Sequence, residues 1–312
     1  MTRRGGRGEN RPLDGVLVVD KPAGIGSTDV VRVVRRAAGQ RRVGHTGTLD
    51  PDATGVLVVC LGRATRLVRF LQVGRKTYLA QMVLGMETTT QDASGQVVAE
   101  RSAAHVDEHG LCEALASFIG EIEQVPPMVS AVKVGGQRLY DLARRGEDVE
   151  RPPRVVTVHE IVLDSFIAGE RAQVTFLVTC SSGTYVRTLA HDIGRALGCG
   201  ATLTELRRLA NGPFTVEDAH PLDEVTVRGE DGTLEAVLLS PREAVRGLPT
   251  FEATPEQALA VAVGRTLPAL GVAGPFAVVT GERLLAVYSD QVGGAQPEAV
   301  LVQPSDLGGA VG

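Results

Sequence analysis

Short apolar runs separated by glycine and proline dominate the hydrophobic pattern of this chain. Unbroken or partly alternating apolar runs predict strands, and such runs lie at 15–20, 55–61, 76–84, 155–163, 172–180, 276–280 and 283–288. Segments with helical patterning lie at 29–38, 64–71, 111–120, 139–145, 184–197 and 255–263. Because strands and helices mix without a regular βαβ alternation, the pattern favours an α+β fold.

Single residues predict where two helices begin. Ser27 or Thr28 supplies an N-cap oxygen for the first predicted helix, with Asp29 in its first turn. Ser240 followed by Pro241 opens a short helix later in the chain. The glycine-rich segment before Ser27 does not match the P-loop pattern, so it is interpreted as a turn followed by a helix cap.

Length and composition narrow the class of protein. The 312 residues suffice for one large domain or two smaller ones, and a hydrophobic content of 43% excludes disorder of the whole chain. No apolar run approaches the roughly 20 residues that span a bilayer, and the basic N-terminus lacks the apolar segment of a secretory signal. The 4 cysteines are far apart, which favours reduced thiols in a cytoplasmic protein without a metal site.

Charge is distributed unevenly along the chain. Residues 1–80 hold 15 Lys and Arg against 6 Asp and Glu, whereas residues 81–211 hold 12 against 17 and residues 212–312 hold 5 against 14. A cationic first third indicates a local anionic partner, because nearby charges set the potential at a surface. Solvated helix faces explain the same charges equally well.

One polar segment, 44–55, concentrates residues that carry chemistry. It reads Gly-His-Thr-Gly-Thr-Leu-Asp-Pro-Asp-Ala-Thr-Gly, between an arginine-bearing helix and a predicted strand. Its glycines let a ligand approach the backbone closely, and Pro51 fixes the turn after Asp50. Catalytic side chains often lie on such loops. A polar turn, in which Asp50 bonds nearby backbone and His45 is exposed, accounts for the same residues.

This segment resembles the signature of the TruB family, the bacterial tRNA pseudouridine-55 synthases. Five further motifs resemble that family in the same order along residues 13–212. They are 15–22 with Gly26-Ser-Thr28, Lys76-Thr-Tyr78, 126–133 with 136–140, 180–189, and Leu206-Arg-Arg-Leu209.

The resemblance implies a fold and a division into domains. It implies an α+β catalytic domain over 13–247, with a mixed, largely antiparallel sheet flanked by helices and loops. A basic disordered tail is expected over 1–12 and a mobile RNA-binding loop near 124–154. A small PUA-like domain is expected over 248–312, where Arg265 and Arg283 are the only cations, which favours a role in stabilising the catalytic domain.

The implied reaction converts the uridine at position 55 in the T-loop of tRNA to pseudouridine, with no cofactor. The base is flipped out, its N-glycosidic bond is cleaved, and the rotated base is rejoined through carbon. Asp50 matches the family's essential carboxylate, which either forms a covalent adduct with the sugar or removes a ribose proton toward a glycal; both routes stay open. Burial disfavours the ionised carboxylate, and Arg187 matches the arginine that would keep it charged.

The remaining site residues are also assigned through the resemblance. Tyr78 matches the aromatic residue that stacks on the target base and assists removal of the C5 proton. Tyr185 and Leu206 match other contacts of the nucleotide, and His45 matches a residue that displaces and holds the uridine. Six arginines are expected to line the path of the RNA backbone: Arg32, Arg35, Arg36, Arg41, Arg42 and Arg69. The implied partner is the T-arm stem-loop of tRNA, bound by a monomer.

The sequence differs from the family pattern in one motif, and two other functions explain part of its residues. Met128 or Val129 stands where the family often has tyrosine. The run 46–49 is similar to the Thr-Gly-Thr run of aspartyl-phosphate enzymes, but there the aspartate precedes the run, and no acidic pair with Mg²⁺-ligand spacing accompanies it here. A non-catalytic RNA-binding protein of the same fold accounts for the basic residues but has no need of Asp50 together with Arg187.

Overall fold

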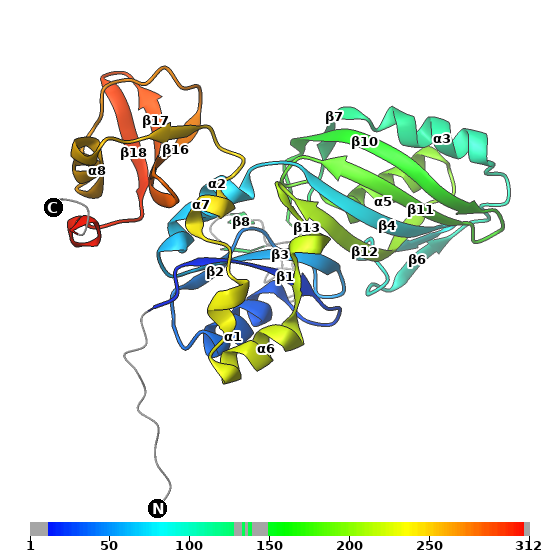
Figure 1. The fold of residues 1–312 in the computed structure, drawn as a ribbon. Coiled ribbons are helices and arrows are strands. Elements are labelled where there is room, and N and C mark those ends of the chain that lie inside the picture. Colours follow the sequence, from blue (N-terminus) through cyan, green and yellow to red (C-terminus); the bar gives the residue numbers. More distant parts are fainter. Residues whose placement is uncertain (1–11, 128–132, 135–136, 139–148, 309–312) are drawn as a thin grey trace, which may run out of the picture. The chain divides into compact units, whose positions relative to one another are not determined.

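The computed structural model describes residues 12–127, 133–134, 137–138 and 149–308 (Figure 1). Within this part the chain forms two compact units. The first unit comprises 12–51, 57–72 and 212–308, and the second comprises 52–56 together with the described residues between 73 and 211. The predicted helix at 139–145 lies outside the described residues.

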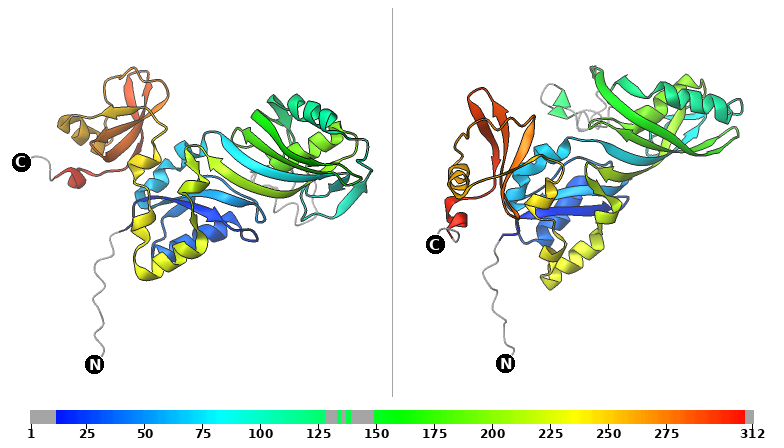
Figure 2. Two further views of the ribbon diagram at one scale, coloured as in Figure 1. Left: turned by 45° about the vertical axis from the view of Figure 1, so that its right-hand side comes forward. Right: turned by 45° about the horizontal axis from the view of Figure 1, so that its top comes forward.

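The first unit begins with buried strands and two helices that pack together. Its first strands and helices are β1 (Gly15–Lys21), α1 (Ser27–Ala37), β2 (Val43–His45), β3 (Thr54–Leu61), η1 (Gly62–Leu67) and α2 (Val68–Gln72). Strand β2 pairs antiparallel with β3, and β14 (His220–Pro221) pairs parallel with β1. Helix α1 lies against α6 (Leu222–Asp231; Figure 2). Valines of α1 pack with leucines of β1 and β3 to form the core.

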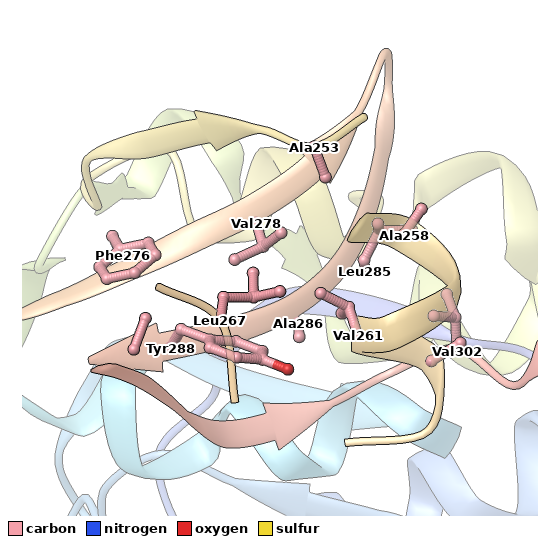
Figure 3. Close-up of a cluster of buried hydrophobic side chains, with 12 residues drawn as sticks. Ala253, Ala258, Val261, Leu267, Phe276, Val278, Leu285, Ala286, Tyr288 and Val302 are labelled. Carbon is pink, nitrogen blue, oxygen red and sulfur yellow. The ribbon is translucent and has the colours of Figure 1, made fainter. Parts of the chain in front are cut away.

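The rest of the first unit carries short helices and a separate small sheet. These elements are β13 (Phe214–Thr215), η2 (Val216–Asp218), η3 (Leu234–Val237), α7 (Pro241–Ala244), β15 (Thr250–Glu252), α8 (Pro255–Ala262), β16 (Pro275–Thr280), β17 (Arg283–Gln291), β18 (Gly294–Val300) and η4 (Pro304–Leu307). The order β15-β16-β17-β18 makes a four-stranded sheet. Its own core includes Phe276, Val261 and Tyr288 (Figure 3), and the Tyr288 hydroxyl donates to the Arg265 carbonyl oxygen over 2.8 Å. Burial raises the pKa of Tyr288 to about 12.

The second unit is built on an antiparallel sheet. Its elements are β4 (Lys76–Leu84), β5 (Met86–Thr88), β6 (Val97–Glu100), α3 (Glu108–Ser117), β7 (Gly120–Gln124), β8 (Lys133–Val134), β9 (Gln137–Arg138), β10 (Arg154–Ile167), β11 (Gln173–Cys180), α5 (Val186–Ala196) and β12 (Ala201–Asn211). The sheet order is β12-β4-β11-β10-β7, and the first residues of β3 pair parallel with β12. Helix α5 packs against β12 and β4.

The α+β prediction is confirmed: sheets of both parallel and antiparallel pairs are flanked by helices. Each predicted strand is present, as is each predicted helix that falls on described residues. The predicted helix at 111–120 runs instead from Glu108 to Ser117, because β7 begins at Gly120, whose φ of 115° is outside the helical region.

One helix cap differs from the sequence-based prediction, and several elements, among them β12, were not predicted. The N-cap of α1 is Gly26, with no side-chain cap bond, so the prediction of a Ser27 or Thr28 cap was wrong. Strand β12 was not predicted, because bulges between Leu203 and Glu205 and between Arg208 and Ala210 break the alternation that marks a strand.

Candidate active site

The backbone before Asp50 is fixed by a serine from helix α1. The Ser27 hydroxyl donates to the Leu49 carbonyl oxygen and accepts from the Leu49 N–H, each over 2.9 Å. Ser27 is 3% exposed and Leu49 is also 3% exposed, so both bonds are shielded from water. A hydroxyl that acts as donor and acceptor to one residue leaves that residue little freedom. Ser27 is therefore a clamp on the Asp50 turn instead of a helix cap.

The backbone after Asp50 is fixed by a buried lysine. Lys21, the last residue of β1, is 0% exposed and donates from Nζ to the carbonyl oxygens of Pro22, Ile25 and Pro51 over 2.8, 2.7 and 2.7 Å. An ammonium group has three protons to donate, and burial is tolerated only when they are satisfied. Lys21 and Ser27 thus hold the residues on both sides of Asp50, whose side chain is partly buried.

His45 lies at the end of β2, opposite Val59 of β3. Its ring is partly buried, and Nδ1 accepts from the Gly47 N–H over 3.2 Å. Next to it, the Thr46 N–H donates to the Val58 carbonyl oxygen over 3.0 Å. The bond from the Gly47 N–H therefore fixes the orientation of the His45 ring. His45 is therefore not fully exposed, as the alternative of a simple polar turn had predicted.

In the second unit, Tyr78 and Leu206 share one face of the sheet. Tyr78 of β4 pairs with Arg208 of β12, and Ala80 pairs with Leu206 in the same register. Directly opposed residues of antiparallel strands point to the same face, as do residues two apart on one strand. Tyr78 is 6% exposed, so its ring is mostly covered. The sheet thus brings together two of the predicted nucleotide contacts.

Tyr185 and Arg187 lie at the start of α5. The Gln124 side chain fixes Tyr185, because its Oε1 accepts from the Tyr185 N–H over 3.0 Å and its Nε2 donates to the Tyr185 carbonyl oxygen over 3.2 Å. The Arg187 guanidinium carbon is 5.9 Å from the centroid of the Tyr185 ring, within the range of a cation–π contact. The structure therefore groups an aromatic ring with a permanent cation at the helix start.

Arg187 is paired with a carboxylate that sequence analysis did not single out. Arg187 is 3% exposed, and its Nη1 donates to Asp92 Oδ2 over 3.1 Å. The other carboxylate oxygen of Asp92 accepts from the Thr90 hydroxyl over 2.6 Å and from the Ser94 hydroxyl and N–H over 2.5 and 3.0 Å. Partial burial opposes ionisation of Asp92, but these hydrogen bonds and the charge of Arg187 hold its pKa below the ordinary value.

The turn that carries Asp92 is anchored to its surroundings. Gln91 adopts a φ of 65°, which is rare for a residue with a side chain. Its side-chain oxygen accepts from the Thr188 hydroxyl over 2.8 Å, and its carbonyl oxygen accepts from the Leu203 N–H over 3.1 Å. These bonds from α5 and β12 hold the strained turn, and therefore Asp92, at a fixed place beside Arg187.

The six arginines predicted to follow the RNA backbone occupy different environments. Arg36 and Arg41 are exposed, Arg32 pairs with Asp29, and Arg35 and Arg42 bond the Val43 carbonyl oxygen and the Thr65 hydroxyl, each over 2.9 Å. Arg69 forms a salt bridge with Glu298 over 2.5 Å. The assignment of these residues to RNA stays a prediction.

Arg69 belongs to a row of arginines that contacts the edge strand of the small sheet. Arg69 and Arg66 donate to the carbonyl oxygens of Glu298 and Val300 in β18, and Arg63 Nη1 donates to that of Leu301 over 3.0 Å. Edge strands expose unpaired carbonyl groups that invite pairing with other chains. Here arginine side chains satisfy those carbonyl groups, so at least part of the first unit's positive charge has a structural use.

Two negative findings concern the described residues alone. Within the ranges given above, no group of three or more His, Cys, Asp or Glu is placed to hold a metal ion. In that same part of the chain, no helix has both the length and the apolar character needed to cross a membrane.

Comparison with known proteins identifies the class to which this fold and these residues belong. A family model for the N-terminal domain of TruB family pseudouridylate synthases matches residues 35–186, and a model for the C-terminal domain of tRNA pseudouridylate synthase B matches residues 187–246. The fold is that of a pseudouridine synthase. The chain belongs to the TruB family.

Curated relatives agree over most of the chain. A tRNA pseudouridine synthase B of Bacillus anthracis is 42% identical over 305 residues, which cover 95% of this chain and 99% of the relative. Proteins of the same name from Geotalea uraniireducens and Thermobifida fusca are 49% and 46% identical over 83% and 92% of this chain and 82% and 98% of the relatives. The predicted family membership is confirmed.

Solved structures support the same fold. A chain of a Cbf5-Nop10-Gar1 complex superposes with a TM-score of 0.73 at 29% identity, and covers 95% of this chain and 87% of its own length. A chain of an H/ACA RNP bound to a substrate RNA containing 2′-deoxyuridine gives a TM-score of 0.71 at 25% identity, with 97% and 93% covered. The architecture of this chain is therefore shared with chains of both structures.

Proposed function

We propose that this protein converts the uridine at position 55 of the tRNA T-loop to pseudouridine, with Asp50 as the essential carboxylate. The observation that carries the proposal is the double clamp on Asp50. Ser27 holds Leu49 and Lys21 holds Pro51, so a carboxylate within a family signature has a fixed backbone on both sides. Preorganisation of this kind is typical of catalytic groups.

The reaction is an isomerisation, so atoms and electrons balance within the nucleotide. The C1′–N1 bond breaks and uracil leaves with the electron pair. Asp50 either bonds C1′ or removes the C2′ proton, and both routes remain possible. After rotation, C5 bonds C1′ as the Asp50–C1′ bond breaks or, on the other route, as the glycal regains its C2′ proton; the C5 proton is then lost and N1 gains a proton. Tyr78 is the residue proposed to stack on the base and assist removal of the C5 proton.

Binding must expose the target base before any chemistry occurs. Unstacking a nucleotide costs a few kcal/mol, which contacts in the pocket and neutralised phosphates offset. His45 is proposed to displace and hold the uridine, with its ring oriented by the bond that Nδ1 accepts from the Gly47 N–H. Tyr185 and Leu206 contact the nucleotide, and the exposed arginines Arg36 and Arg41 face the RNA backbone.

Arg187 is proposed to keep Asp50 ionised in a pocket from which water is excluded. A buried cation of this kind needs its own support, and Asp92 supplies it through the bond to Nη1. Arginine suits the task because it stays charged when buried and can grip a carboxylate with two parallel bonds. Asp92 is thus a positioning residue for Arg187.

The proposal extends to the partner and the setting. The T-arm stem-loop of tRNA is the proposed substrate, because an RNA hairpin presents splayed loop bases on a shape that a protein can recognise. We propose that a monomer in the cytoplasm carries out the reaction.

The experiment is to incubate the protein with unmodified tRNA in EDTA, without nucleotide, and to map pseudouridine by carbodiimide adducts and primer extension. The proposal predicts one new stop at position 55 and none in a tRNA with cytidine at that position. Absence of modified base in the first RNA, or a requirement for metal or ATP, would contradict it.

A further inference from the structure

Arg208 is a buried cation that the reaction described above does not use. Its exposure is 1%, and its Nε donates to the Val56 carbonyl oxygen over 2.6 Å. Its buried Nη2 has no hydrogen-bond partner, and among the residues that the structure describes no carboxylate pairs with it. Burial of an uncompensated charge costs stability, so a protein keeps one only where another gain offsets the loss.

The register of the sheet places this charge beside the proposed base-binding residues. Arg208 lies directly opposite Tyr78 and two residues after Leu206, with regular pairing through this stretch of β12 and β4. All three side chains therefore belong to one face of the sheet. A uracil that stacks on Tyr78 and touches Leu206 would lie in the field of the Arg208 guanidinium.

Neighbouring groups do not cancel that field. On the same face, Cys180 pairs with Lys76 across the strands, and burial raises the pKa of the Cys180 thiol to about 11, so it is neutral. Burial first, and then the charge of Arg208, lowers the pKa of Lys76 to about 8. The effect on Lys76 is itself a sign that the local potential is positive.

The backbone at Arg208 is also fitted closely to the start of β3. Gly55 has a φ of 96°, and a side-chain carbon there would meet the Arg208 carbonyl oxygen at 2.2 Å. This close approach fixes the backbone that carries Arg208, and the bond from Nε to the Val56 carbonyl oxygen holds the guanidinium before substrate arrives. A fixed charge in a water-poor site needs no reorganisation when a reaction creates the opposite charge.

We propose that Arg208 stabilises the uracil anion that forms when the C1′–N1 bond breaks. The inference rests on the proposed function. In that step the electron pair of the bond leaves with uracil and spreads over its ring and carbonyl oxygens, while the sugar is satisfied by Asp50 or by loss of the C2′ proton. Because the anion exists only after cleavage begins, a nearby cation lowers the barrier instead of merely tightening binding.

The test compares Arg208→Gln with Arg208→Lys by the single-turnover rate at which each variant forms pseudouridine in T-arm RNA. Glutamine can keep a donor to Val56 without the charge, and lysine keeps the charge. We expect Arg208→Gln to slow the reaction of uridine about 10- to 100-fold. Its RNA affinity should be unchanged, and its melting temperature should be unchanged or higher. Arg208→Lys should recover most of that loss. Arg195→Lys and Arg195→Gln, at an exposed position of α5, are the matched controls.

A second substrate separates an electrostatic role from a structural one. Fluorine at C5 stabilises the uracil anion, so RNA with 5-fluorouridine at the target should lose much less rate in Arg208→Gln than RNA with uridine. Equal losses for both RNAs, a normal rate, or a parallel fall in melting temperature would overturn the inference. If the unaltered protein is inactive on both RNAs, the proposed function itself fails, which is a different result from loss in the variant alone.

Discussion

The Asp50 turn and the start of α5 carry opposite charges and are held by opposite means. Around Asp50, the neighbouring backbone is fixed, by Ser27 before it and Lys21 after it. Arg187 is instead fixed through its own side chain, by the bond from Nη1 to Asp92. The bonds around Asp50 fix the position of its backbone, whereas the bond at Arg187 fixes the position of its guanidinium.

The difference fits the two proposed roles. A carboxylate that must bond carbon or take a proton benefits from a fixed backbone, because the backbone sets where the side chain starts without occupying the oxygen that reacts. A cation that only has to be present can be tied directly to a partner. Substitutions that remove the bonds around Asp50 and the bond at Arg187, one at a time, therefore test this comparison.

The largest effect is expected at Asp50 itself. Asp50→Asn keeps the shape of the side chain but removes the nucleophile or base, so turnover should fall by roughly 10³-fold or more. Binding of tRNA, measured by filter retention, should change little. Asp52→Asn, two residues away and exposed, is the control and should keep its rate. Equal loss of binding and turnover in Asp50→Asn would count against the assigned role.

The next largest effect is expected for Arg187→Lys. Lysine keeps the charge but cannot reach two partners with a rigid fork, so the single-turnover rate should fall roughly 10²-fold. Arg195→Lys, an exposed substitution of the same kind on the same helix, should be close to normal. Near-normal turnover of Arg187→Lys would refute the proposal that turnover needs a buried arginine beside the carboxylate.

A smaller effect, on stability, is expected for Asp92→Asn. The folded pKa of Asp92 is depressed, so its contribution to stability is present above the ordinary pKa of aspartate and is lost as pH falls through the folded value. Near neutral pH the variant should lose about 1–3 kcal/mol. Urea unfolding from pH 3 to 7 should show a smaller dependence on pH in the variant; identical curves would contradict the prediction.

The smallest effect is expected for Ser27→Ala. Removing the hydroxyl leaves the buried N–H and carbonyl oxygen of Leu49 without their partner, at a cost of about 1–2 kcal/mol. Thr28→Ala, the exposed neighbour, is the matched control for thermal melting. Because Ser27 acts on the Asp50 turn, its variant should also lose turnover; stability loss with full activity would show that the clamp does not position Asp50.

Much of the fold could be predicted from sequence because the responsible signals are local. The apolar runs of β1 and β3 and the Thr254, Pro255 and Gln257 capping box at the start of α8 lie within a few residues of the elements they define. The strand β12 could not be predicted in this way, because its two bulges interrupt the pattern.

The partners within the candidate site could not be predicted, since they join residues far apart in the chain. Ser27 bonds a residue 22 positions away, Lys21 one 30 away and Arg187 one 95 away. The serine at a helix start has an ordinary local explanation as a cap, which proved wrong, and nothing local marks Asp92 as the partner of Arg187. Asp50, Tyr78 and Arg187 were found through resemblance to a family, and their roles stay predictions.

The pH dependence of the single-turnover rate tests most directly whether a guanidinium keeps Asp50 charged. In the unaltered protein, the rate should stay constant from pH 8 down to about pH 5, because the carboxylate remains ionised. In Arg187→Met, the rate should be lower and its acid limb should move to higher pH, because the carboxylate would lose the neighbouring cation. If the rate of Arg187→Met is lower by the same factor at every pH, so that its acid limb stays at the same pH as in the unaltered protein, the account is contradicted.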